Sequence, residues 1–184
     1  RIAALAGEIA PLVGASAEDA TKAARLAKLD LRSSMVGEFP ELQGVMGRYY
    51  ALEVGEKAAV ADAVRDHYSP LGPSDDVPGE PVSVAVALAD KIDTLTGFWA
   101  IDEKPTGSKD PYALRRAALG IVNNLLTAKA DFSVRNNVLK AAVLQPVKVA
   151  ESAINEAIAF IEKRLEGVLL ELGFSYDIVA AVLA

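Results

Sequence analysis

Residues 82–99 read VSVAVALADKIDTLTGFW, and this stretch decides how the rest of the chain must fold. Apolar side chains occupy most of its positions, so a helix formed by it is apolar on nearly every side. Such a helix is stable only when other elements cover it. We therefore expect residues 82–99 to form the central, buried helix of the fold.

The sequence on both sides of this stretch predicts further helices and almost no strand. Apolar residues recur at helical spacing, as in Ile2, Leu5 and Ile9, whereas alternating patterns are scarce. Gly14 should end the first helix, and Ser16 should cap the second. The remaining predicted helices are residues 56–68, 110–129, a segment capped by Ser133, 148–172, and a segment after Ser175. The sequence therefore predicts an all-α fold.

Two segments before the central stretch carry more specific expectations. Pro40 suits the first turn of a helix, which should direct Leu42, Val45, Met46 and Tyr49 toward the core. Residues 69–81 are rich in Pro, Gly, Ser and Asp, a composition typical of an extended loop. We expect this loop to separate two halves of the bundle.

Composition excludes several classes of site. The 184 residues include no cysteine and one histidine, so disulfides, thiolate metal sites and multi-histidine centres are excluded. The net charge of -6 is not that of a general nucleic-acid binder. Charged residues interrupt every long apolar run, so we expect no membrane-spanning helix. We expect the protein to be cytoplasmic. The first residue is Arg1, and we expect the chain to be a piece of a longer protein.

Residues 104–116, KPTGSKDPYALRR, contain the best candidates for phosphate contact. Gly107, Ser108 and Lys109 resemble the end of a P-loop, but the glycine that a P-loop needs upstream is missing. Asp110 should cap a helix with Pro111 in its first turn. The segment has a local charge of +3, and its four candidates for tRNA or phosphate contact are Lys104, Lys109, Arg115 and Arg116.

Each of these arginines has an alternative role. Arg115 and Arg116 are consecutive, so their side chains point about 100° apart on a helix. One of them could pair with Asp90, Asp93 or Glu41 inside the fold, while the other faces a nucleic acid or another subunit.

Carboxylates on apolar helices form the second candidate site. Asp90 and Asp93 are three residues apart and share a face of the central helix, and Asp30 lies at the end of another helix. They either cap or pair with neighbouring groups, or they bind a metal ion. His67 could supply an imidazole to such an ion, although a lone histidine near a helix end more often packs or caps.

Two stretches resemble HD-domain proteins, which are helical metal-dependent phosphohydrolases. Residues 1–31 are similar to the opening of that domain, and residues 86–95, VALADKIDTL, are similar to the helix that donates its last metal-binding aspartate. The resemblance places Asp30 and Asp90 at two ligand positions, but Leu29 stands where the histidine of the His-Asp doublet belongs. It therefore implies a degenerate HD-like helical bundle with no metal and no catalytic residue.

Three longer stretches resemble a second family. Residues 35–52, 86–101 and 104–126 are similar, in this order, to the beta subunit of bacterial tetrameric glycyl-tRNA synthetase. The resemblance implies an enzyme that attaches glycine to tRNA(Gly) using ATP, through an alpha subunit that holds the catalytic core. This region would then be noncatalytic, without a cofactor of its own, and would support tRNA binding and subunit architecture. The implied partners are the alpha subunit, tRNA(Gly) and a second beta subunit.

The expected organisation follows from both resemblances. Residues 1–130 would form the HD-like domain, and residues 131–184 would be appended C-terminal helices leading toward a next domain, or part of one continuous domain. The aromatic and methionine side chains of residues 35–50 either pack in the core or form a surface for the alpha subunit or tRNA. The alternative functions are an active HD-type nucleotide phosphohydrolase and a scaffold for the alpha subunit that does not contact RNA.

Overall fold

The computed structural model describes residues 1–72 and 75–183, and every regular element in them is helical. The ten α-helices are α1 (Ile2–Ile9), α2 (Ala17–Leu26), α3 (Ser34–Glu38), α4 (Val45–Glu53), α5 (Ala58–Asp66), α6 (Pro81–Ala100), α7 (Leu114–Ala128), α8 (Val134–Val143), α9 (Glu151–Glu171) and α10 (Tyr176–Leu183). Three short 3₁₀ turns, η1 (Ala10–Val13), η2 (Leu29–Arg32) and η3 (Pro40–Leu42), join some of them. The prediction of an all-α fold is confirmed.

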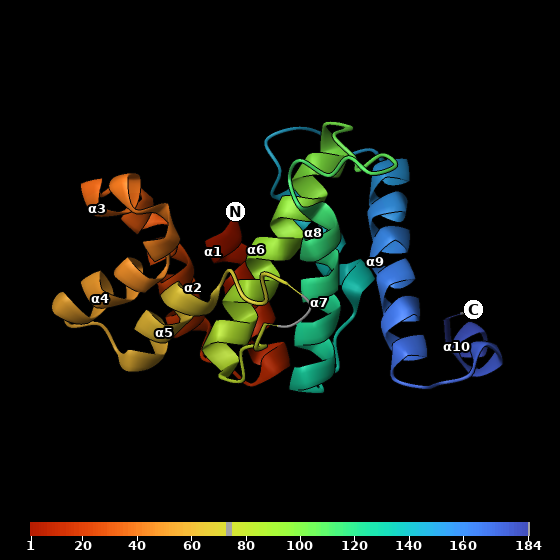
Figure 1. Ribbon diagram of the computed structural model, residues 1–184, viewed down its shortest axis with the longest axis horizontal. Helices are drawn as coiled ribbons and strands as arrows, with labels where there is room; N and C mark the ends of the chain where they lie inside the picture. Colours follow the sequence, from red (N-terminus) through yellow and green to blue (C-terminus); the bar gives the residue numbers. More distant parts are fainter. Residues whose placement is uncertain (73–74, 184) are drawn as a thin grey trace.

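Helix α6 lies in the middle of the molecule, as Figure 1 shows. It begins with Pro81, whose fixed φ suits a first helical turn, and 15 of its 20 residues are buried. It packs directly against α1, α2, α5, α7, α8 and α9. Leu88, Ile92 and Leu95 are among the largest fully buried side chains of the chain. The central helix expected from residues 82–99 is therefore present.

The other helices extend from α6 in two directions. Helices α3, α4 and α5 lie toward one end of the molecule, and α9 and α10 lie toward the other (Figure 1). Helices α8 and α9 both contact α6, so residues after 130 share the same central helix as residues before it. Within the described part of the chain, no helix combines the length and apolar content needed to cross a membrane.

Several helix ends follow the predicted punctuation. Ser16 accepts a hydrogen bond from the backbone N–H of Asp19, and Ser133 accepts one from Asn136. Gly14, at φ 75°, ends the turn that continues α1. Gly173 follows α9 at φ 92°. These caps satisfy backbone groups that the helices leave without intrahelical partners.

Two expectations about helix position were wrong. Helix α4 turns Val45 and Tyr49 toward solvent, because its inward face is formed by Gly47 and Ala51, which allow close packing against neighbouring residues. Helix α7 begins at Leu114 rather than at Pro111, because Ala113 adopts a left-handed conformation with φ 55° and interrupts the helix. The composition of these segments did not reveal the orientation of α4 or the start of α7.

The packing around α6 predicts a large cost for shortening one of its core side chains. Replacing the fully buried Leu88 by Ala should lower the free energy of unfolding by about 3 kcal/mol, because it leaves a cavity at the centre of the bundle. Leu172→Ala, at an exposed position, is the matched control and should change stability by less than about 1 kcal/mol. Chemical denaturation of the three proteins measures the difference. Equal stability of all three would contradict the central placement of α6.

Candidate functional site

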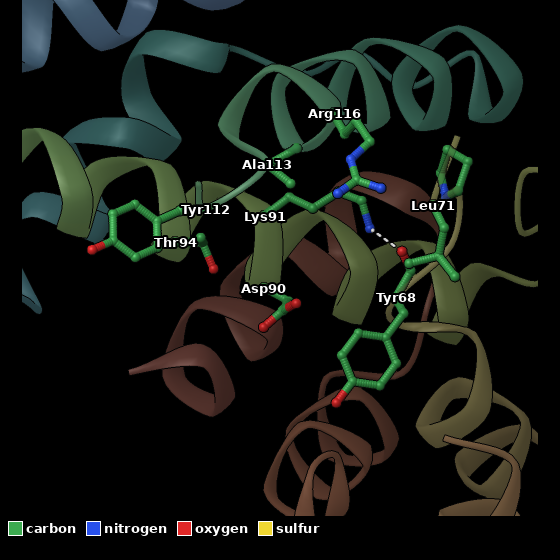
Figure 2. Close-up of a pocket in the computed structure, with 10 residues that line it drawn as sticks. Tyr68, Leu71, Asp90, Lys91, Thr94, Tyr112, Ala113 and Arg116 are labelled. Atoms are coloured by element: carbon green, nitrogen blue, oxygen red, sulfur yellow. Dashed lines mark hydrogen bonds between the residues drawn. The ribbon is translucent and has the colours of Figure 1, made fainter. Parts of the chain in front are cut away.

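The candidate site lies where three segments meet beside α6. Its pocket, of about 180 Å³, is lined by Asp90, Lys91 and Thr94 of α6, by Tyr112, Ala113, Arg116 and Ala117 around the start of α7, and by Tyr68, Pro70 and Leu71 after α5. Figure 2 shows these side chains around the pocket, with Arg116 reaching down from α7. Two stretches singled out in the sequence, residues 86–95 and 104–116, therefore meet at one site.

Lys28 supplies the cation nearest to Asp90. Its Nζ lies 3.0 Å from Asp90 Oδ1 and 3.3 Å from His67 Nε2, and it sits 4.4 Å from the centre of the Tyr68 ring. Asp90 Oδ1 has no aligned hydrogen bond among the described residues, so its contact with Lys28 is electrostatic. Lys28 has φ 74°, a left-handed conformation that is uncommon for a non-glycine residue. The ammonium group thus occupies the space between Asp90 and His67.

His67 is fully buried and is held in one tautomer by its contacts. Its Nδ1 lies 2.7 Å from the carbonyl oxygen of Val64, so Nδ1 carries the proton and donates it there. Nε2 is then free to accept from Lys28. Burial, together with the positive charge of Lys28, lowers the pKa of His67 to about 4. The imidazole is therefore neutral near pH 7.

Lys91 of α6 hydrogen-bonds to the carbonyl groups that follow the C-terminus of α5. Its Nζ donates to the carbonyl oxygens of His67, Tyr68 and Ser69 at 3.1, 3.2 and 2.8 Å, and Figure 2 draws the contact with Tyr68. Burial lowers the pKa of Lys91 to about 8. Gly120 allows Lys91 to pass along α7, because a Cβ at residue 120 would lie only 2.5 Å from Lys91 Cε. The helix end and the loop after it are fixed to α6 by this one ammonium group.

Asp30 acts on the backbone of α4 instead of facing Asp90. Its Oδ2 accepts from the N–H groups of Gly44 and Gly47, at 2.6 and 3.1 Å, at the N-terminus of that helix. Asp30 and Asp90 both add to the effect of burial in raising the pKa of Tyr68 to about 12. The two carboxylates predicted from the HD resemblance therefore both act on Tyr68, and each has separate partners.

The third carboxylate, Asp93, is also paired. Arg1 donates to its two oxygens at 2.9 and 3.1 Å, and Gln145 donates to Oδ1 at 3.0 Å. Neither Arg115 nor Arg116 reaches a carboxylate of α6 in the structure, so the suggested pairing of one of them with Asp90 or Asp93 is not formed.

These contacts do not fit the metal site of an HD domain. Asp30 is directed to backbone N–H groups, Asp90 faces the Lys28 ammonium, and the free nitrogen of His67 faces the same ammonium. In residues 1–72 and 75–183, no three His, Cys, Asp or Glu side chains are placed to share one ion. A divalent cation at this place would be opposed by the charge of Lys28.

The structure separates the four basic candidates of residues 104–116. Lys104 is paired with Asp102 and Glu156, each at 2.6 Å, and Arg115 donates to the carbonyl oxygen of Gly107 at 2.6 Å. Lys109 and Arg116 are exposed, and neither forms an ion pair with another described residue. The Asp110 carboxylate accepts from the N–H groups of Leu114 and Arg115, so it still caps α7 from outside the helix.

Sequence reasoning did not identify Lys28, Lys91 or Tyr68 as parts of this site. Lys28 could not be found because its partners are 39 and 62 positions away and its left-handed backbone carries no sequence signal. Lys91 did carry a signal, since a lysine within a helix that is apolar on all sides needs buried acceptors.

Burial of His67 predicts a loss of stability in mild acid. The pKa of His67 is about 4 in the fold and near 6.5 in the unfolded chain, so only the unfolded state binds a proton between these values. Stability should therefore fall as pH decreases from 6.5 to 4, by about 3 kcal/mol from this residue alone.

Comparison of the wild type with His67→Gln isolates this contribution from carboxylate titration, because the chain has no other histidine. Urea denaturation at a series of pH values should show a shallower pH dependence for His67→Gln. Parallel curves for the two proteins would contradict a buried, neutral His67.

Comparison with known proteins identifies the family. The family model described as glycyl-tRNA synthetase beta subunit matches residues 1–184. Glycine–tRNA ligase beta subunits from Paracoccus denitrificans, Ruegeria and Cereibacter sphaeroides are 62%, 58% and 57% identical to the chain, in alignments that include all of it. The chain spans 26% to 27% of the length of these relatives. The chain therefore belongs to the glycyl-tRNA synthetase beta subunit family.

Proposed function

We propose that this chain is a noncatalytic helical region of the beta subunit of a glycine–tRNA ligase, and that it supports tRNA binding and subunit architecture. The match of the family model to all 184 residues carries the proposal. In this proposal, the complete enzyme attaches glycine to tRNA(Gly) with ATP, and the alpha subunit uses the ATP. The partners are the alpha subunit, tRNA(Gly) and a second beta subunit, and the enzyme is cytoplasmic.

The chemistry of the pocket beside α6 supports a structural role for the HD-like positions. Asp30 caps a helix, Asp90 faces a lysine, and Lys91 holds the end of α5, so each charged group serves the fold. A nucleophile or general base must reach a substrate proton, whereas Asp30, Asp90 and Lys91 are buried in the fold. Asp30, Asp90 and Lys91 are therefore assigned to stability and not to catalysis.

Lys109 and Arg116 are the residues we assign to phosphate contact. Both are exposed and lie on either side of the Asp110 cap, near the N-terminus of α7. Arg115 adds positive charge nearby. Burial lowers the pKa of Arg164 on α9, and the charge of Arg115 acts in the same direction. Exposed cations near one another can neutralise phosphates that lie a few ångströms apart along an RNA backbone. Lys104 forms an ion pair with Glu156, and we assign it the role of positioning the loop.

Charge reversal tests this assignment in the complete enzyme. Lys109→Glu and Arg116→Glu should each weaken tRNA(Gly) binding several-fold and reduce the salt dependence of binding by about one counterion, because each removes one phosphate contact. Filter binding or anisotropy at several salt concentrations measures both quantities.

The control is Arg25→Glu, which reverses an exposed arginine of α2 without an ion pair to any described residue. It should leave the salt dependence unchanged. If Lys109→Glu and Arg116→Glu also leave affinity and salt dependence unchanged, this region is a scaffold for the alpha subunit that does not contact RNA.

A further inference from the structure

A second cavity is lined in part by Asp30. This groove, of about 390 Å³, has walls formed by Leu26 and Leu29, before and within η2, and by Tyr50, Ala51 and Val54 at the end of α4. Arg32, Ser33, Gly47 and Asp30 complete it. Its volume is in the range of sites that hold an organic group.

Asp30 gives the groove a polar group that the fold does not satisfy. Its Oδ2 accepts two backbone hydrogen bonds, but its buried Oδ1 has no hydrogen-bond partner among the described residues. The residue is 2% exposed. A buried carboxylate oxygen without a donor is costly, so a donor arriving through the groove gains a charge-assisted hydrogen bond.

The walls define the rest of the ligand. Leu29, Tyr50 and Val54 are exposed large apolar residues, and a group with a flat apolar body can cover them. The combination of an apolar groove and one unpaired acceptor matches an aromatic ring that carries a single N–H or O–H donor. Tryptophan and tyrosine side chains have this chemistry, and both are common anchors of protein interfaces.

The charge of this part of the chain favours a polypeptide over a nucleic acid. The charged residues that line the groove are Asp30 and Arg32, whose charges cancel, so the groove offers no excess of positive charge to a phosphate backbone. Apolar side chains remain exposed beyond the groove, at Leu31, Met35 and Tyr49. A protein surface can cover these neighbours together with the groove.

We propose that this groove binds the side chain of a tryptophan or tyrosine from a partner polypeptide, with the ring donating a hydrogen bond to Asp30 Oδ1. Because Oδ1 is closed off from water, binding requires side chains that line the groove to move and open a path to it. The Gly44 and Gly47 contacts of Oδ2 hold the carboxylate in place during docking. The proposal does not depend on the role assigned to Lys109 and Arg116.

A matched pair of probes tests the hydrogen bond in the complete subunit. N-acetyl-5-fluorotryptophanamide carries the indole N–H, and its 1-methyl derivative differs only by the loss of that donor. Fluorine NMR line broadening on titration measures binding of each. The first probe should bind about tenfold more tightly than the methylated one, because only it can donate to the carboxylate.

Two variants connect this preference to the groove. In Asp30→Asn, the amide oxygen can keep the bonds from Gly44 and Gly47 while the NH₂ group replaces Oδ1, so the preference for the N–H probe should disappear. Val54→Arg should block the groove and weaken both probes. Val143→Arg, at a highly exposed valine of α8, is the control and should bind both probes like the wild type.

Equal binding of the two probes to the wild type overturns the proposal, as does a preference that survives Asp30→Asn. Absence of broadening at millimolar probe also overturns it. Displacement of the bound probe by single-stranded RNA, but not by a tryptophan-containing peptide, would assign the groove to base stacking and contradict a polypeptide partner.

Discussion

The burial of helix α6 on nearly all sides is the constraint on which the rest of the structure depends. This helix carries Asp90, Lys91 and Asp93 within a core of aliphatic side chains. A charged group in such a place is tolerated only when a neighbour pairs or hydrogen-bonds with it. The elements around α6 are positioned accordingly: Lys28 follows α2 to reach Asp90, Arg1 precedes α1 and reaches Asp93, and the end of α5 accepts from Lys91.

This pairing gives Asp90, one of the two aspartates marked by the HD resemblance, a role other than metal binding. At the Asp90 position, the lysine ammonium provides the opposite charge for the carboxylate and a hydrogen-bond donor for Nε2 of the neutral imidazole. An ammonium on the chain itself is permanent, needs no ion from solution and cannot activate water as a metal ion does. In the proposed function, the contacts of Asp90, Lys28 and Lys91 hold α2, α5 and α6 together, and RNA contact is assigned to the exposed cations Lys109 and Arg116 near the start of α7.

The sequence predicted the features that depend on local patterns. The apolar run of residues 82–99 indicated the central helix, and Ser16 and Ser133 indicated two helix starts. The sequence did not predict features set by contacts between distant segments. Helix α4 is oriented with Tyr49 toward solvent because Gly47 packs closely against Val64 and Asp30. Helix α7 begins late because Ala113 adopts a left-handed backbone conformation. In the site, Asp30 and Asp90 are buried carboxylates, but their partners are backbone groups and a lysine that no local pattern marks.

A double-mutant cycle between Lys28 and Asp90 tests most directly whether pairing of the charges on α6 holds the fold together. The free energies of unfolding of Lys28→Met, Asp90→Asn and the double variant are measured against the wild type. The account predicts that the effects are not additive, with a coupling energy of more than about 1 kcal/mol, because each single change leaves the other group without its partner. Effects that add to within about 0.5 kcal/mol would show that the two residues are independent, and would contradict the account.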